Sequence, residues 1–86
     1  MADAREFTLA LLANRAVNAT ICPSEVARAV AEKSDGKDAH SWRREMPAVH
    51  AAIDDLLARG LVRISWKGHD LPARTGPYRV RRVRPN

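Results

Sequence analysis

The stretch from Ser41 to Lys67 limits the possible folds most, because it joins an amphipathic helix directly to a strand. Apolar side chains recur there at i, i+3, i+7, i+10 and i+11, which places them on one face of a helix. These residues are Met46, Val49, Ile53, Leu56 and Leu57. Gly60 suits the left-handed position that follows a last helical turn. The next residues alternate, with Val62, Ile64 and Trp66 on one side of a strand. The pattern predicts a helix that packs on a sheet.

Pro47 divides the helical part of this stretch. Proline lacks the N–H that an interior helical position requires, so it favours the first turn of a helix. We therefore expect a helix over residues 42–59 with a break near 46–47, so that a short turn from Trp42 to Glu45 precedes the main helix. Ser41 is a suitable N-cap for the short turn.

A first helix is expected over residues 3–16, which contain strong helix formers and neither Gly nor Pro. Its apolar residues fall on two sides. One side holds Leu9, Leu12, Ala13 and Ala16, and the nearly opposite side holds Phe7 and Leu11. Either the fold covers both sides of this helix, or one side meets a second copy of the chain in a homodimer.

A short strand is expected at residues 19–22, because they favour extended structure, and a second helix over residues 23–33. Pro23 suits the first helical position. Glu25 lies three residues after Cys22, where its carboxylate can reach back in the manner of a capping box. The face expected to be buried holds Cys22, Val26, Ala29 and Val30.

The last third predicts a hairpin over residues 61–83. Its return strand begins at Tyr78, and a loop of roughly ten residues from Gly68 to Pro77 joins the two strands. The order of elements predicts a mainly α protein with a small β-hairpin, that is, a winged helix-turn-helix with three helices and a two- to three-stranded antiparallel wing. Eighty-six residues make one domain, residues 1–86.

Charge divides the chain more sharply than its net value of +5 suggests. Residues 1–58 contain seven basic and nine acidic residues, a net charge of −2. Residues 59–86 contain eight basic residues and one acidic residue, a net charge of +7. This asymmetry indicates a polyanionic partner for the C-terminal third, whereas a solvated basic hairpin that aids solubility is the alternative.

The sequence lacks the usual signals of membrane proteins, secreted proteins, metal-binding proteins and enzymes. No apolar run approaches the roughly 20 residues of a membrane span, and the N-terminal stretch does not resemble a secretory signal, so a cytoplasmic protein without a membrane partner is expected. One cysteine and three dispersed histidines give no metal-site spacing. No nucleophile with a base and no paired carboxylates are evident, so we expect no enzyme activity and no cofactor.

Several short motifs together resemble a known family. They are CPSEVARA at residues 22–29, WRREMPAV at 42–49, LxxGxVxI at 57–64, KG at 67–68 and GPYRV at 76–80. The combination is similar to a bacterial family of short proteins catalogued as a domain of unknown function and regarded as winged-helix-like. The resemblance covers nearly the whole chain and implies that fold, without an established activity.

We expect a non-catalytic protein that binds nucleic acid, most simply duplex DNA, as a small transcriptional regulator would. In a winged helix the start of the third helix enters the major groove and the wing contacts the backbone. The expected contacts are Arg43, Arg44 and His50 on the helix, and Lys67, His69, Arg74, Arg79 and Arg81 on the wing. If five or six phosphates are neutralised, the logarithm of the binding constant should fall with the logarithm of the salt concentration with a slope of about −5.

Acidic residues on the third helix leave this expectation open, and an alternative function remains. Asp54 and Asp55 would repel phosphates if they faced a duplex. The alternative is a protein-interaction or dimerisation module that docks a partner through the first helix without binding DNA. The two tryptophans and Tyr78 are expected to pack against the core rather than to stack on bases.

Overall fold

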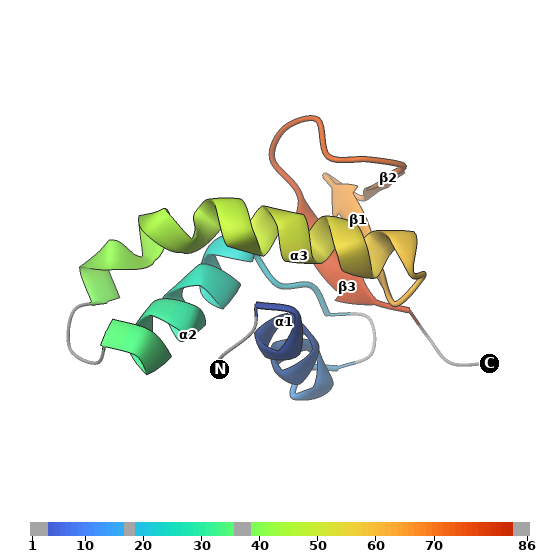
Figure 1. Cartoon of the computed structure of the whole chain (residues 1–86). Coiled ribbons are helices and arrows are strands. Elements are labelled where there is room, and N and C mark those ends of the chain that lie inside the picture. Colours follow the sequence, from blue (N-terminus) through green and yellow to red (C-terminus); the bar gives the residue numbers. More distant parts are fainter. Residues whose placement is uncertain (1–3, 17–18, 36–38, 84–86) are drawn as a thin grey trace.

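A computed structural model describes residues 4–16, 19–35 and 39–83 of the chain. Helices and a three-stranded antiparallel sheet make up this mixed α+β fold (Figure 1). In chain order the elements are α1 (Ala4–Ala13), α2 (Pro23–Asp35), the 3-10 helix η1 (Ala39–Glu45), α3 (Met46–Ala58), β1 (Val62–Trp66), β2 (His69–Leu71) and β3 (Arg79–Arg82).

The start of α2 has the predicted capping arrangement. The backbone N–H of Cys22 donates to Glu25 Oε2 at 3.0 Å, and the N–H of Glu25 donates to the Cys22 carbonyl at 2.9 Å. The helix begins at Pro23, as expected from the missing N–H of proline. Its buried residues include Val26 and Val30, as predicted, whereas Ala29 is only half-buried. The reciprocal bonds satisfy donors that the first helical turn would otherwise leave unpaired.

The break near Pro47 is also present. The tighter helix η1 ends at Glu45 and α3 begins at Met46, with Pro47 in its first turn. Ser41 therefore lies within η1 rather than before a helix. At the other end of α3, Gly60 has φ +75°, its N–H donates to the Leu57 carbonyl, and the N–H of Leu61 donates to the Leu56 carbonyl. This pair of bonds is a Schellman motif, which ends the helix and directs the chain into β1.

The sheet corrects the predicted hairpin. Its strand order is β2-β1-β3, so residues 69–71, assigned to a loop from the sequence, form a strand beside β1. Trp66 pairs with His69 across a two-residue turn in which Lys67 has φ 52° and Gly68 has φ 83°. Positive φ at both turn residues gives the right-handed twist that such hairpins need. Lys67 occupies the position before Gly68, where asparagine or aspartate is usual.

Two boundaries near the N-terminus differ from the expectation. Helix α1 ends at Ala13 rather than at residue 16. The predicted strand at 19–22 is reduced to one bridge, in which Ile21 and Val80 exchange two backbone hydrogen bonds of 2.8 and 2.9 Å. The bridge positions the chain just before Pro23, so the start of α2 lies beside β3.

The buried face of α1 also differs. Leu12 is buried as predicted, but Leu9 on the same predicted side is 38% exposed. Phe7 and Leu11, from the opposite predicted side, are partly buried against the core. Thr8 can share the buried face because its hydroxyl donates to the carbonyl of Ala4 at 2.7 Å.

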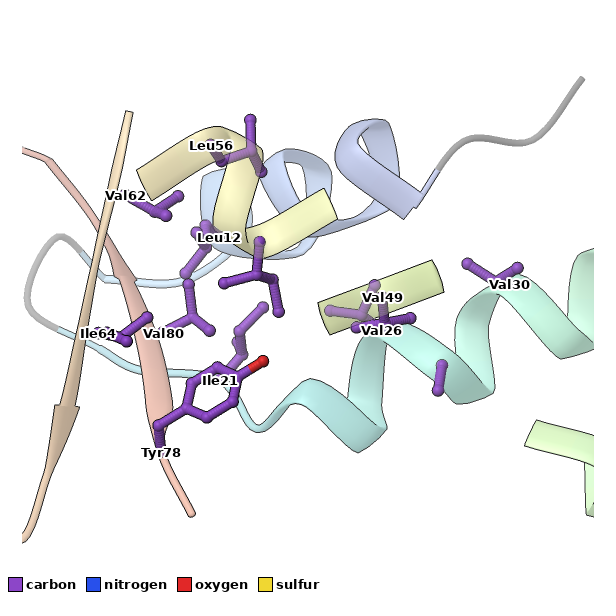
Figure 2. Close-up of a cluster of buried hydrophobic side chains, with 12 residues drawn as sticks. Leu12, Ile21, Val26, Val30, Val49, Leu56, Val62, Ile64, Tyr78 and Val80 are labelled. Carbon is purple, nitrogen blue, oxygen red and sulfur yellow. The ribbon is translucent and has the colours of Figure 1, made fainter. Parts of the chain in front are cut away.

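A single core joins the helices to one face of the sheet (Figure 2). Val49, Ile53 and Leu56 of α3 are buried in it, as the helical spacing predicted. Val62, Ile64 and Val80 close it from the sheet, and the ring of Tyr78 lies at its edge. Three helices plus this sheet are consistent with a helix-turn-helix that carries a wing.

Candidate functional site

The outer face of the sheet, meaning the face turned away from the core, is basic. Because side chains alternate along a strand, Arg63 of β1 and Arg79 and Arg81 of β3 share this face. Arg63 lies directly opposite Arg81 in the register, and Arg79 lies opposite Ser65. Like charges that face each other across two strands destabilise a sheet. Arg63 therefore faces a like charge, and the ion pair between Arg81 and Asp70 offsets part of this repulsion.

Neighbouring polar groups orient two of these arginines. Arg81 donates to both carboxylate oxygens of Asp70, at 3.0 and 3.3 Å, across β1. Arg79 donates from Nε to the Thr20 hydroxyl at 2.7 Å. Both side chains keep further guanidinium donors, because each guanidinium carries five N–H groups. Asp70 neutralises one charge, so the face formed by Arg63, Arg79, Arg81 and Asp70 retains a net positive charge.

Arg74 is positioned differently from the other predicted wing cations. Its Nε and Nη2 donate to the two carboxylate oxygens of Asp54, each at 2.8 Å. This bidentate pair ties the loop before Tyr78 to α3. The hydrogen bond from Arg74 lowers the pKa of Asp54, and the same bond raises the pKa of Arg74. The guanidinium is therefore already paired with a carboxylate of α3 and is less available to a phosphate.

Lys67 and His69 lie in the β1–β2 turn and at the start of β2. Both are exposed. In the described part of the chain neither makes an ion pair. Lys67 follows β1 directly, so its charge extends the basic face toward the tip of the hairpin.

Arg43 and Arg44 come from η1, before α3, rather than from the sheet (Figure 1). Both are exposed. The guanidinium carbon of Arg43 lies 4.7 Å from the ring centroid of Trp42, and that of Arg28 in α2 lies 5.0 Å from the same ring. These cation–π contacts hold two positive charges beside the indole.

His50 lies half-buried on α3, where it meets the sheet. Its Nδ1 is 2.6 Å from the hydroxyl of Tyr78, and in the neutral imidazole this nitrogen can accept a hydrogen bond from that hydroxyl. Burial lowers the pKa of His50, with a smaller lowering from Arg74 and an opposing effect of Asp54. Burial also raises the pKa of Tyr78. The imidazole therefore stabilises the contact between α3 and the sheet, and it faces inward rather than toward a duplex.

The exposed face of α3 offers little to a base edge. Its most exposed residues are Pro47, Ala48, Ala51 and Ala58. Reading of bases in the major groove needs side chains that donate or accept hydrogen bonds. Asp55, on the same helix, is held by Arg5 at 3.1 Å and by Arg59 at 2.9 Å, and these bonds lower its pKa. The main role of α3 in the fold is to pack its apolar face against the core.

A groove lies between the start of α2, the start of α3 and the sheet, with a volume of about 480 Å³. Most of its walls are apolar or aromatic. The lining residues are Cys22, Pro23, Ser24, Trp42, Met46, His50, Trp66, Gly76, Pro77, Tyr78 and Arg79. Tyr78 and Trp42 also pack against the core as expected, but Trp66 is 39% exposed and the packing expected of it is wrong.

The strand register adds Arg63 to the predicted set of cations. The alternation of β1 places the side chain of Arg63 on the outward side, together with Lys67 four residues later, and this was the local signal for it. Nothing in the sequence indicated which residue of β3 would face it.

No helix in the described part of the chain is long and apolar enough to cross a membrane. Within residues 4–16, 19–35 and 39–83, no three His, Cys, Asp or Glu side chains gather where they could hold a metal ion.

The fold and the site together define a small mixed α+β protein, consistent with a helix-turn-helix plus wing, whose sheet has a basic outer face. Its motifs and its elements lead to one family. The chain belongs to the family described as protein of unknown function (DUF3253), whose model matches residues 2–83. A comparison with curated proteins finds no match.

Proposed function

We propose that this protein binds nucleic acid through its phosphate backbone, most simply duplex DNA, as a small transcriptional regulator would. The observation that carries the proposal is the alignment of Arg63 opposite Arg81, with Arg79 beside them, on the uncovered face of the sheet. Sequence-independent affinity for nucleic acid comes from such phosphate contacts. The alanine-rich exposed face of α3 supports backbone contacts rather than base reading.

The structure also changes the expected strength of binding. Arg74 is paired with Asp54 and His50 with Tyr78, so neither belongs to the main contact set. Asp70 offsets the charge of Arg81, so Arg63, Lys67 and Arg79 remain as the sheet cations that no carboxylate of the described residues neutralises. Three neutralised phosphates correspond to a log–log salt slope of about −2.7 rather than about −5.

Fluorescence anisotropy of a labelled random 20-base-pair duplex tests the proposal. Affinity should fall about 40-fold between about 50 and 200 mM salt, because this is the loss that three neutralised phosphates produce. Charge reversal by Arg79→Glu together with Arg81→Glu should abolish binding at the lower salt. Affinity that does not change with salt, or that survives the double reversal, would refute the electrostatic mechanism.

The predicted interaction module has weaker support. Apolar residues on two sides of α1 were the reason to expect a partner, and Phe7 and Leu11, on one of these sides, pack against the core of this chain. On the other side, Leu9 is 38% exposed. A homodimer through α1 stays a prediction. Sedimentation over a range of concentrations, with Leu9→Glu for comparison, measures it.

A further inference from the structure

The aromatic groove has features that nucleic-acid binding by the outer face does not use. Its volume of about 480 Å³ lies in the range of roughly 300–1,000 Å³ that small-molecule sites occupy. Trp42 from η1, Met46 from α3 and Trp66 from β1 form its walls. A half-exposed tryptophan in a chain with only two of them is a large apolar surface left in contact with water.

Positive charge is in excess around the groove. Among the described residues that line it, Arg79 has the one charged side chain; this residue also belongs to the outer face and donates to Thr20. The nearby carboxylates of Glu25 and Asp54 are each paired with an arginine. Arg28 and Arg43 are not lining residues, but their guanidinium carbons lie 5.0 and 4.7 Å from the ring centroid of Trp42, which lines the groove. No aspartate or glutamate of the described residues lines the groove. The surroundings therefore favour an anion over a cation of the same shape.

The polar groups inside the groove are largely engaged with one another. His50 is hydrogen-bonded to the Tyr78 hydroxyl, and Ser24 Oγ donates to Cys22 Sγ at 3.1 Å. An occupant therefore meets mainly flat apolar surface, with positive charge at its edge. Indole walls prefer a planar ring, which can stack on them or meet them edge to face.

We propose that this groove binds a small planar aromatic molecule that carries one negative charge, of the aromatic carboxylate class. The ring lies against Trp42, Trp66 and Met46, and the carboxylate lies toward Arg79 and the guanidinium groups beside Trp42. The proposal does not depend on nucleic-acid binding. Because helical and sheet residues both line the groove, an occupant would bridge the two halves of the fold.

Nuclear magnetic resonance offers a direct test, because the two tryptophans of the chain both line the groove. The probes are 2-naphthoate, the neutral 2-naphthylmethanol and the cationic 2-naphthylmethylamine, which share one ring system. Naphthoate should shift both indole N–H signals and bind at least about fivefold more tightly than the alcohol, with the amine weakest. At about ten times its Kd it should raise the Tm by about 5 °C or more.

Matched variants locate the effect. Trp66→Ala should weaken naphthoate binding at least about tenfold, whereas Leu61→Ala, which removes another exposed side chain outside the groove, should not. Arg79→Gln should bring the Kd of naphthoate close to that of the alcohol, and Arg63→Gln, on the outer face but not in the groove, should leave their ratio unchanged.

Any of five results would overturn the proposal. The first three are equal affinity for the three probes, unmoved indole signals, and equal effects of Arg79→Gln and Arg63→Gln on the ratio. The fourth is a short oligothymidylate that shifts the indole signals while naphthoate does not, which would assign the groove to a nucleic-acid strand. Indole signals that move on dilution of the protein alone, with no response to naphthoate, would assign it to a second copy of the chain and overturn the proposal equally.

Discussion

Arg63→Glu separates the stability of the fold from the proposed nucleic-acid binding. In the native sheet Arg63 faces Arg81, so the substitution replaces two like charges with an opposite pair. Cross-strand ion pairs contribute about 0.2–1 kcal/mol, but solvent screens exposed charges. Arg81 already pairs with Asp70, which would also repel the new carboxylate, so the gain lies at the low end of this range. The free energy of unfolding should therefore rise by about 0.2–0.5 kcal/mol, which corresponds to a Tm about 1–4 °C higher.

The same change should impair binding. One phosphate contact is lost and a negative charge enters the basic face, so affinity for a random duplex should fall about tenfold and the salt slope should shrink by about 1. Calorimetry and fluorescence anisotropy on one preparation give both values. Lys33→Glu, on exposed α2 surface outside the face, makes the same charge change and should leave affinity within about twofold.

A variant that melts lower than the native protein would refute the register-based reasoning. A variant that binds duplex DNA as well as Lys33→Glu does would refute the role of the outer face. The two failures are separable, because one concerns the cross-strand pair and the other concerns the phosphate contact.

Three further predictions follow from local geometry and from one pKa. Lys67→Asn should stabilise the protein by about 0.5–1 kcal/mol, because asparagine tolerates the left-handed conformation that Lys67 adopts at φ 52°; chemical denaturation measures the change, and an unaltered midpoint would contradict it. Gly60→Ala should cost about 1–2 kcal/mol from backbone strain alone, since φ is +75° and a Cβ would meet nothing within 4 Å; a loss under half of the lower figure would contradict it. His50 should titrate below 6.5 by NMR, because burial lowers its pKa. Its neutral form favours folding, so this contribution is present above pH 6.5 and is lost as the pH falls through the folded-state pKa. If the His50→Gln variant loses stability over that pH range as steeply as the native protein does, another group is responsible.

Local signals predicted most elements of the fold. Pro47 marked the boundary between η1 and α3, Gly60 marked the end of α3, and Glu25 marked the start of α2, because each acts through the backbone of its nearest neighbours. Strand β2 was missed since three residues near Gly and Pro look like a loop until a partner strand is known. The ends of α1 and the bridge at Ile21 were also misjudged, because helical propensity continues past the point where tertiary contacts end it.

The candidate site was less predictable than the fold. The sequence indicated that Arg79 and Arg81 would share the outward side of a strand, and the structure places them there. It did not indicate that Arg74 would pair with Asp54, twenty residues away. Such pairing depends on how a loop returns over a helix.

The sequence alone determined where α2 and α3 begin, where α3 ends, which face of α3 is apolar and where positive charge accumulates, because caps, periodicity and composition act over a few residues. Only the tertiary structure decided that Arg63 faces Arg81, that His50 bonds to Tyr78, and that Trp66 lies at a groove with Met46. Those relations depend on strand register and on the packing of α3 against the sheet. A shift of one residue in that register would turn Arg63 toward the core and Val62 toward water, which explains why the chemistry of the surface emerges only when the chain has folded.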